Sequence, residues 1–75
     1  MNKSFYQFTL SFRGGSLTDP KARFAERMFD DHSFPKTSTS FEELSSYIET
    51  QADDALSTQA FDELWDLYRA KFEID

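Results

Sequence analysis

The stretch that decides the fold runs over residues 61–72 and reads FDELWDLYRAKF. Its large apolar residues, Phe61, Leu64, Trp65 and Tyr68, recur at steps of three and four. This spacing places them on one stripe of an α-helix. Acids fill the first half of the stretch and bases the second, as suits a helix dipole that is positive at its N-terminus. The pattern predicts an amphipathic helix with an aromatic buried face.

Side chains that cap helices precede three of the apolar runs. Asp19 comes before Pro20, which fits the first helical position because its missing N–H costs nothing there. Ser40 comes three residues before Glu43, which predicts a reciprocal capping box at the start of a helix. The candidate N-caps of the last helix are Ser57 and Thr58.

The segment from Lys3 to Arg13 fits two periodicities. Tyr6, Phe8, Leu10 and Phe12 alternate as in a strand, whereas Phe5, Phe8 and Phe12 fit a helix. A lone strand cannot satisfy its backbone hydrogen bonds, and no second alternating run is present to pair with it. We therefore predict a helix, ended by Gly14-Gly15.

The composition predicts one aromatic core. The chain has 75 residues with nine Phe, three Tyr, one Trp and no Cys, so packing must hold the fold without disulfides. We expect a single all-α domain over residues 1–75, in the cytoplasm, since no apolar run is long enough to span a membrane. In the second helix, Phe29 is expected on the buried side. The predicted core is Phe5, Phe8, Phe12, Phe24, Met28, Phe34, Phe41, Leu44, Ile48, Phe61, Leu64, Trp65 and Tyr68.

Charge is divided unevenly along the chain. The net charge is −6, but residues 1–40 hold six bases against four acids and residues 41–75 hold two bases against ten acids. Solvated helix faces would explain this division, and so would a dipolar module that meets a charged partner with one end. The candidate basic patch for nucleic-acid binding is Lys3, Arg13, Lys21, Arg23, Arg27 and Lys36.

Catalytic chemistry has little support. His32 is the only histidine and has no cysteine to partner it, so neither a triad nor a metal site is indicated. We expect no enzyme activity, cofactor or metal. His32 follows the second helix on the side of Phe24 and Met28, which favours a partly buried structural role.

The loop before the third helix is the best candidate for a site. Pro35 forces Phe34 out of the helical region, and a cation and several hydroxyls follow. In one interpretation the loop contacts a partner, and in the other Phe34 fills the core while the hydroxyls order a turn. The candidate interaction residues are His32, Phe34, Pro35, Lys36, Thr37 and Ser38.

Several pieces of the chain together resemble the YozE-like family of small bacterial proteins. They are Phe5-Tyr6, the loop from Asp31 to Ser38, Glu43 to Glu49, and Phe61 to Tyr68. The resemblance implies a compact, orthogonal bundle of four or five helices similar to a sterile alpha motif, with no assigned activity to carry over. We expect a non-enzymatic module for protein–protein interaction, with an unknown protein or a second copy as partner. The alternative is nucleic-acid binding through the basic half.

Overall fold

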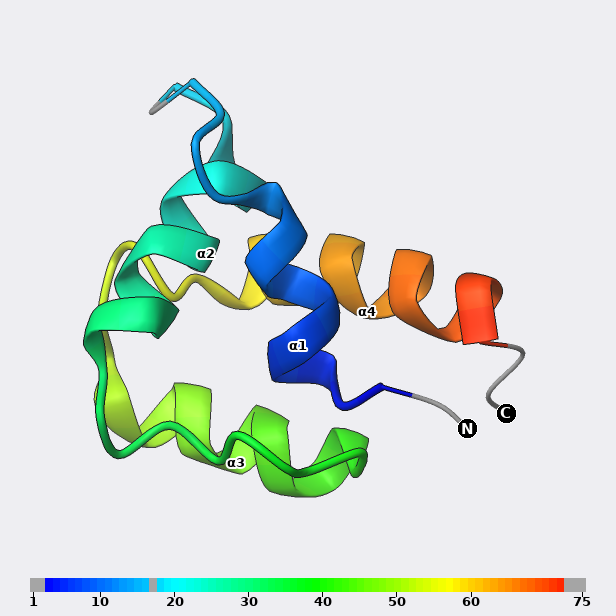
Figure 1. Cartoon of the computed structure of the whole chain (residues 1–75). Coiled ribbons are helices and arrows are strands. Elements are labelled where there is room, and N and C mark those ends of the chain that lie inside the picture. The colour runs from blue at the N-terminus through cyan, green and yellow to red at the C-terminus, as the bar shows by residue number, and fades with distance from the viewer. Residues whose placement is uncertain (1–2, 17, 73–75) are drawn as a thin grey trace.

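Helices α1, α2 and α3 all contact the C-terminal helix α4. A computed structural model describes residues 3–16 and 18–72. In Figure 1, α1 crosses in front of the bundle at a steep angle to α4, and α3 lies below both. Over the described ranges the chain forms helices and no strand, which confirms the all-α prediction and makes the strand alternative for the first segment wrong. The elements are α1 (Phe5–Thr9), a 3-10 helix η1 (Leu10–Phe12), α2 (Pro20–Asp30), α3 (Phe41–Gln51) and α4 (Thr58–Phe72).

Helix α1 begins with a capping box that the sequence reading missed. The Ser4 hydroxyl accepts a hydrogen bond from the Gln7 N–H at 3.2 Å, and the Gln7 side chain accepts one from the Ser4 N–H at 3.3 Å. Together these bonds satisfy two N–H groups at the start of the helix. The helix then tightens into η1, and Gly14 reverses the chain at a φ of 87°. The predicted helix is therefore present, but its regular part is shorter than residues 3–13.

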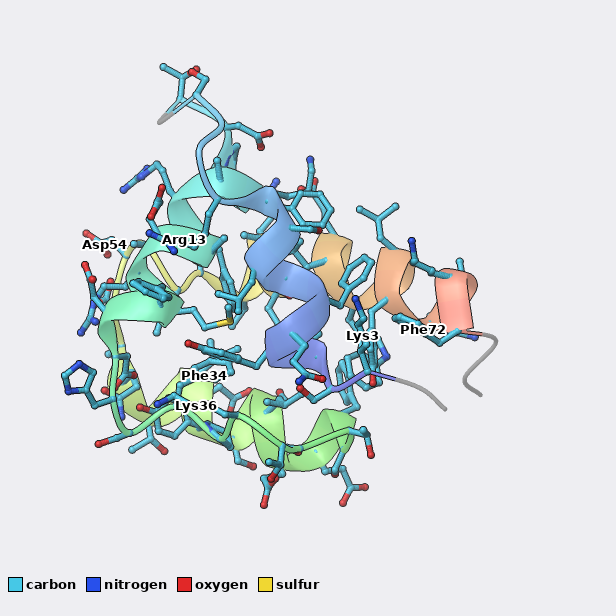
Figure 2. All side chains as sticks on the ribbon, viewed as in Figure 1. Lys3, Arg13, Phe34, Lys36, Asp54 and Phe72 are labelled. Atoms are coloured by element: carbon cyan, nitrogen blue, oxygen red, sulfur yellow. The ribbon has the colours of Figure 1, made fainter. Side chains whose placement is uncertain are left out.

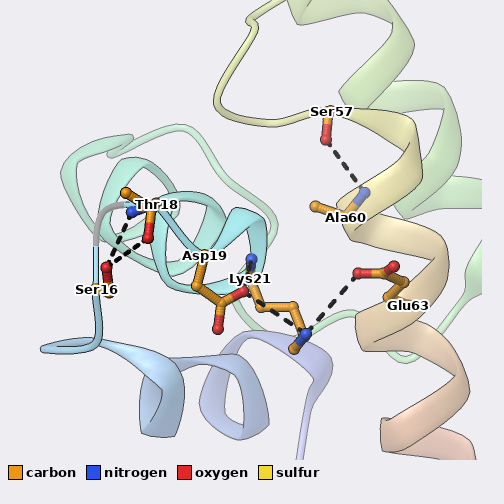
Figure 3. A network of polar contacts seen from close by, with 7 residues as sticks. All are labelled: Ser16, Thr18, Asp19, Lys21, Ser57, Ala60 and Glu63. Carbon is orange, nitrogen blue, oxygen red and sulfur yellow. Dashed lines mark hydrogen bonds and ion pairs between the residues drawn. The ribbon is translucent and has the colours of Figure 1, made fainter.

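The other three helices start close to the positions that their capping residues indicated in the sequence. The Asp19 carboxylate accepts from the Lys21 N–H at 3.0 Å, with Pro20 as the first helical residue. The Ser57 hydroxyl accepts from the Ala60 N–H at 3.1 Å, so Ser57 rather than Thr58 caps α4 (Figure 3).

Only half of the capping box predicted for α3 forms. The Ser40 hydroxyl accepts from the Glu43 N–H at 3.2 Å, but the Ser40 N–H donates to the Ser38 hydroxyl at 3.1 Å. A serine two residues upstream thus replaces the Glu43 carboxylate as the acceptor.

Phe5 is the centre of an aromatic core. Its side chain is fully buried, and its ring centroid lies 5.3 Å from that of Phe61, 5.7 Å from Tyr68 and 6.1 Å from Phe24. These three pairs are edge-to-face, which is a favourable geometry for aromatic rings. The core therefore joins the first helix to α2 and α4 through one side chain. The buried residues that were predicted are Phe5, Phe24, Met28, Phe34, Leu44, Ile48, Phe61, Leu64, Trp65 and Tyr68.

Two phenylalanines expected inside are half exposed. Phe29 in the last turn of α2 and Phe41 in the first turn of α3 each keep 43% of their surface accessible. Phe41 packs on the rings of Phe61 and Trp65 from outside, and the Phe29 ring faces the exposed Arg13 guanidinium. Phe8 and Phe12 are only partly buried at the edge of the core, and Leu56 and Ala60 are core residues that the sequence reading did not include.

Candidate functional site

The loop from Asp31 to Ser40 is attached to the bundle by its aromatic residue and its backbone. Phe34, labelled in Figure 2, is 3% exposed. Its ring packs against Tyr6 of α1 and Tyr47 of α3, at centroid distances of 5.9 and 5.4 Å. The Ser4 hydroxyl donates to the Lys36 carbonyl at 2.7 Å, and the Phe5 N–H donates to the Ser38 carbonyl at 3.4 Å. Phe34 is therefore part of the core and is not available to a partner.

His32 is exposed, contrary to the expectation of a partly buried side chain. Helix α2 ends at Asp30, and Asp31 adopts an extended conformation with φ −90° and ψ 100°. This change of direction takes His32 off the buried stripe of α2.

The polar half of the loop lines a small hollow beside the start of α1. Lys36 and Thr37 are exposed, and with Ser4, Gln7 and Thr39 they line an open hollow of about 210 Å³. Pro35 and Ser38 are partly buried. The loop thus offers a cation and hydroxyls to solvent, without the aromatic side chain that the sequence had placed among them.

A tyrosine of α3 fixes the first residue of the loop. The Tyr47 hydroxyl donates to the Asp31 carboxylate, which also accepts from the Ser33 N–H at 3.0 Å. Burial of Tyr47, together with its hydrogen bond to Asp31, raises the pKa of Tyr47 to about 12. The Tyr47 phenol is a donor at neutral pH, and this contact holds the loop against α3.

Arg27 ties α2 to the segment between α3 and α4. Its Nε lies 2.8 Å from Asp53 Oδ2. This hydrogen bond lowers the pKa of the Asp53 carboxyl and raises the pKa of the Arg27 guanidinium. The pair joins two segments that are 26 positions apart in sequence.

Two more members of the candidate basic patch also have internal partners. Arg13 Nε lies 2.9 Å from Glu26 Oε1, which together with the Gly14 N–H lowers the pKa of the Glu26 carboxyl. Lys21 Nζ lies 3.6 Å from Asp19 and 3.9 Å from Glu63 of α4 (Figure 3).

The remaining three bases come from separate segments. Lys3 precedes α1, Arg23 lies on α2 and Lys36 lies in the loop, and all three are exposed. Within residues 3–16 and 18–72 none of them forms an ion pair. The six bases are therefore split between internal ion pairs and scattered surface positions.

A groove that the sequence reading missed runs between the start of α3 and α4. We call it the α3–α4 groove; it is open, has a volume of about 520 Å³, and is lined by Phe41, Asp62, Trp65, Asp66 and Arg69. The Phe41 ring lies 5.4 Å from both the Phe61 and the Trp65 centroids. Phe41 thus packs on the core from outside and presents its other side to solvent. Its position directly after the Ser40 cap did not signal this exposure, since Phe5 also follows a serine cap directly and is fully buried.

The wall of this groove on α4 is acidic. Asp62 and Asp66 are exposed, lie one helical turn apart, and form no ion pair with any residue the structure describes. Asp66 lies in the middle of α4, beyond the first turn where the helix dipole favours acids. Arg69 is one turn further on and lines the same groove.

Residues 3–16 and 18–72 contain neither a cluster of possible metal ligands nor a helix that could span a membrane. No three His, Asp or Glu side chains there gather as metal ligands would. None of the helices in those ranges combines the length and apolar character that a bilayer span requires.

Comparison with known proteins gives concordant matches over nearly the whole chain. A family model described as YozE SAM-like fold matches residues 4–70. A UPF0346 protein of Geobacillus kaustophilus is 52% identical over 68 residues, covering 91% of this chain and 94% of that protein. The UPF0346 protein YozE of Bacillus subtilis is 45% identical over 69 residues, covering 92% of this chain and 93% of that protein. The names of these relatives state no activity, substrate or partner.

Proposed function

The chain belongs to the YozE SAM-like family, and on that footing we propose that it is a non-enzymatic protein-binding module whose binding surface is the α3–α4 groove. The observation that carries the proposal is Phe41, a large aromatic side chain left 43% exposed beside Trp65 in a groove with a charged rim. Aromatic side chains surrounded by polar groups are enriched in protein interfaces and supply much of their binding energy. The likeness to a sterile alpha motif adds only an analogy of fold.

The shape of the groove favours a macromolecule over a small substrate. Sites for small molecules usually enclose most of the ligand in a concave pocket. The α3–α4 groove is an open surface hollow between two helices, with exposed carboxylates along one wall. Such a surface suits an extended or helical segment of a partner protein.

The nucleic-acid alternative has less support than its sequence pattern suggested. Binding to nucleic acid depends on bases that are free to replace the counterions of phosphates. Arg13, Lys21 and Arg27 already face carboxylates of the same chain, and breaking those pairs would oppose binding. The acidic half adds repulsion.

Replacing Phe41 tests the proposal. The control is Phe29→Ser, because Phe29 has the same exposure as Phe41 and lies outside the groove. Tagged wild-type protein, Phe41→Ser and Phe29→Ser are used to capture proteins from a nuclease-treated lysate of the source bacterium, after circular dichroism has verified that each is folded. A protein captured by wild type and Phe29→Ser and lost from Phe41→Ser supports the proposal. Equal capture by all three variants contradicts it.

A further inference from the structure

We infer that the α3–α4 groove receives a cationic side chain, lysine or arginine, from a basic segment of the partner protein. This inference rests on the proposed function and specifies the chemistry of the partner. The groove resembles the surroundings of Phe29, a second exposed phenylalanine on the same molecule.

Phe29 shows how this chain covers an exposed aromatic ring. The Arg13 guanidinium lies over the Phe29 ring, 3.6 Å from its centroid, and the Glu26 carboxylate holds the same guanidinium at 2.9 Å. A cation is thus held between an aromatic face and a carboxylate. Attraction to the ring quadrupole and to the carboxylate act on it together.

Phe41 has the same exposure and similar neighbours, but its cation is not supplied by the described part of the chain. The ring is 43% exposed, as is that of Phe29, and the carboxylates of Asp62 and Asp66 line the same groove. The cation–aromatic contacts among residues 3–16 and 18–72 involve Phe29 and Tyr6, not Phe41 or Trp65. The groove therefore repeats the aromatic ring and the carboxylate of the Phe29 site, and a partner would bring the cation.

The charge around the groove favours the same kind of partner. The lining residues hold two acids and one base, and residues 41–75 as a whole hold ten acids against two bases. A basic segment is attracted to such a surface before contact, and an acidic one is repelled. Glu42 and Glu43 in the first turn of α3 offset the positive end of that helix dipole next to Phe41.

Among the described residues that line the groove, Arg69 is the one base, and it gives the inference a further test. If the partner supplies a cation, the positive charge of Arg69 repels it within the same groove. Removing the Arg69 charge should then strengthen binding. If the partner were acidic, Arg69 would be its main contact and removing the charge would weaken binding.

The first test uses a defined probe. An acetylated, amidated peptide of alternating Arg and Gly is titrated into 15N-labelled protein, with the Glu–Gly peptide of equal length as control. We expect the Arg peptide, and not the Glu peptide, to shift the NMR signals of the Trp65 indole N–H and of the backbone amides around Phe41. These shifts should become smaller as salt is added. No shift at these positions with millimolar Arg peptide would overturn the inference.

Charge variants test the geometry. Asp62→Asn and Asp66→Asn should each weaken binding of the Arg peptide by about two- to five-fold, as expected for exposed ion pairs. Arg69→Gln should strengthen it by a similar factor. Asp54→Asn is the control, since Asp54 is exposed, lies outside the groove and has no ion pair within the described ranges; it should leave affinity unchanged. Equal weakening by Asp54→Asn would indicate unspecific attraction and overturn the inference.

The captured partner separates failure of the inference from failure of the proposed function. One outcome is a partner whose capture is lost with Phe41→Ser but is unchanged in the double variant with Asp62→Asn and Asp66→Asn. Another is a partner whose capture is lost with Phe41→Ser and whose binding is weakened by Arg69→Gln. Either outcome leaves the groove as the interface and overturns the inference that it receives a cation. A partner that Phe41→Ser retains overturns the proposed function itself. A partner that is lost with both Phe41→Ser and the double Asn variant, and gained with Arg69→Gln, supports both.

Discussion

Phe5 and Phe41 are each the first residue of a helix, directly after a serine cap, yet their surroundings give them different roles. Phe5 has rings from α2 and α4 around it and is fully buried. Phe41 is the first residue of its helix and contacts the core with one side only. Burial makes Phe5 a source of stability, and exposure makes Phe41 a candidate for recognition.

Trp65 lies in the core and also lines the α3–α4 groove, and truncating it tests its contribution to stability. It is 8% exposed, so Trp65→Ala should lower the free energy of unfolding by about 3–5 kcal/mol through lost burial and the cavity left behind. Leu67→Ala on the same helix should cost about 0.5 kcal/mol or less, since Leu67 is 44% exposed. Urea unfolding followed by far-ultraviolet circular dichroism measures both. A Trp65→Ala variant as stable as Leu67→Ala would mean that the tryptophan is not part of the core.

Helix ends are the elements where sequence and structure differ most. The interiors of α2, α3 and α4 follow the apolar spacing, because a repeat of three and four residues has one buried side. The ends depend on contacts from elsewhere. Ser4 begins α1 while also donating to the Lys36 carbonyl 32 positions away, and no local pattern contains that partner.

The α3–α4 groove could not be predicted from the sequence, because it also depends on contacts between distant segments. Phe41 fits the buried stripe of α3 by spacing, and only the arrangement of α3 on α4 leaves it half exposed. Asp62 and Asp66 fit an ordinary solvated helix face until Phe41 is placed beside them. The ion pairs of Arg13, Lys21 and Arg27 likewise follow from packing, so the sequence could show the bases but not how many face carboxylates.

The residue that caps the end of α3 has a strained backbone, and a substitution can relieve the strain. Ala52 adopts a left-handed conformation with φ 50° and ψ 39°, which is unfavourable for a residue with a Cβ. Ala52→Gly should therefore raise the free energy of unfolding by about 0.5–1 kcal/mol, after the entropy that glycine adds to the unfolded chain. Ala70→Gly, inside α4, should act in the opposite direction. Thermal unfolding of the two variants measures the effect, and destabilisation by Ala52→Gly would contradict this account.

At the scale of the whole molecule, ion pairs join segments that are distant in sequence, in addition to the aromatic core. Arg27 and Asp53 link α2 to the segment after α3, and Lys21 links the start of α2 to Glu63 of α4. Exposed pairs of this kind are each worth at most about 1 kcal/mol. In a domain of this size, whose total stability is small, even such pairs contribute noticeably to the balance.

These pairs give the stability of the molecule an acid dependence whose sign is fixed. The pKa values of Asp53 and Glu26 lie below their ordinary values of 3.8 and 4.5 in the folded protein, because Arg27 and Arg13 donate to the charged carboxylates. Their stabilisation is therefore complete above those ordinary values and is lost as the pH falls through the lower folded values. Asp53→Asn should lower the free energy of unfolding by about 0.5–1 kcal/mol at pH 7 and by progressively less toward pH 2. Urea unfolding from pH 7 to pH 2 measures this difference, with Asp54→Asn as the unpaired control. A difference between wild type and Asp53→Asn that stays constant over this range would mean that the Arg27–Asp53 pair does not contribute in solution.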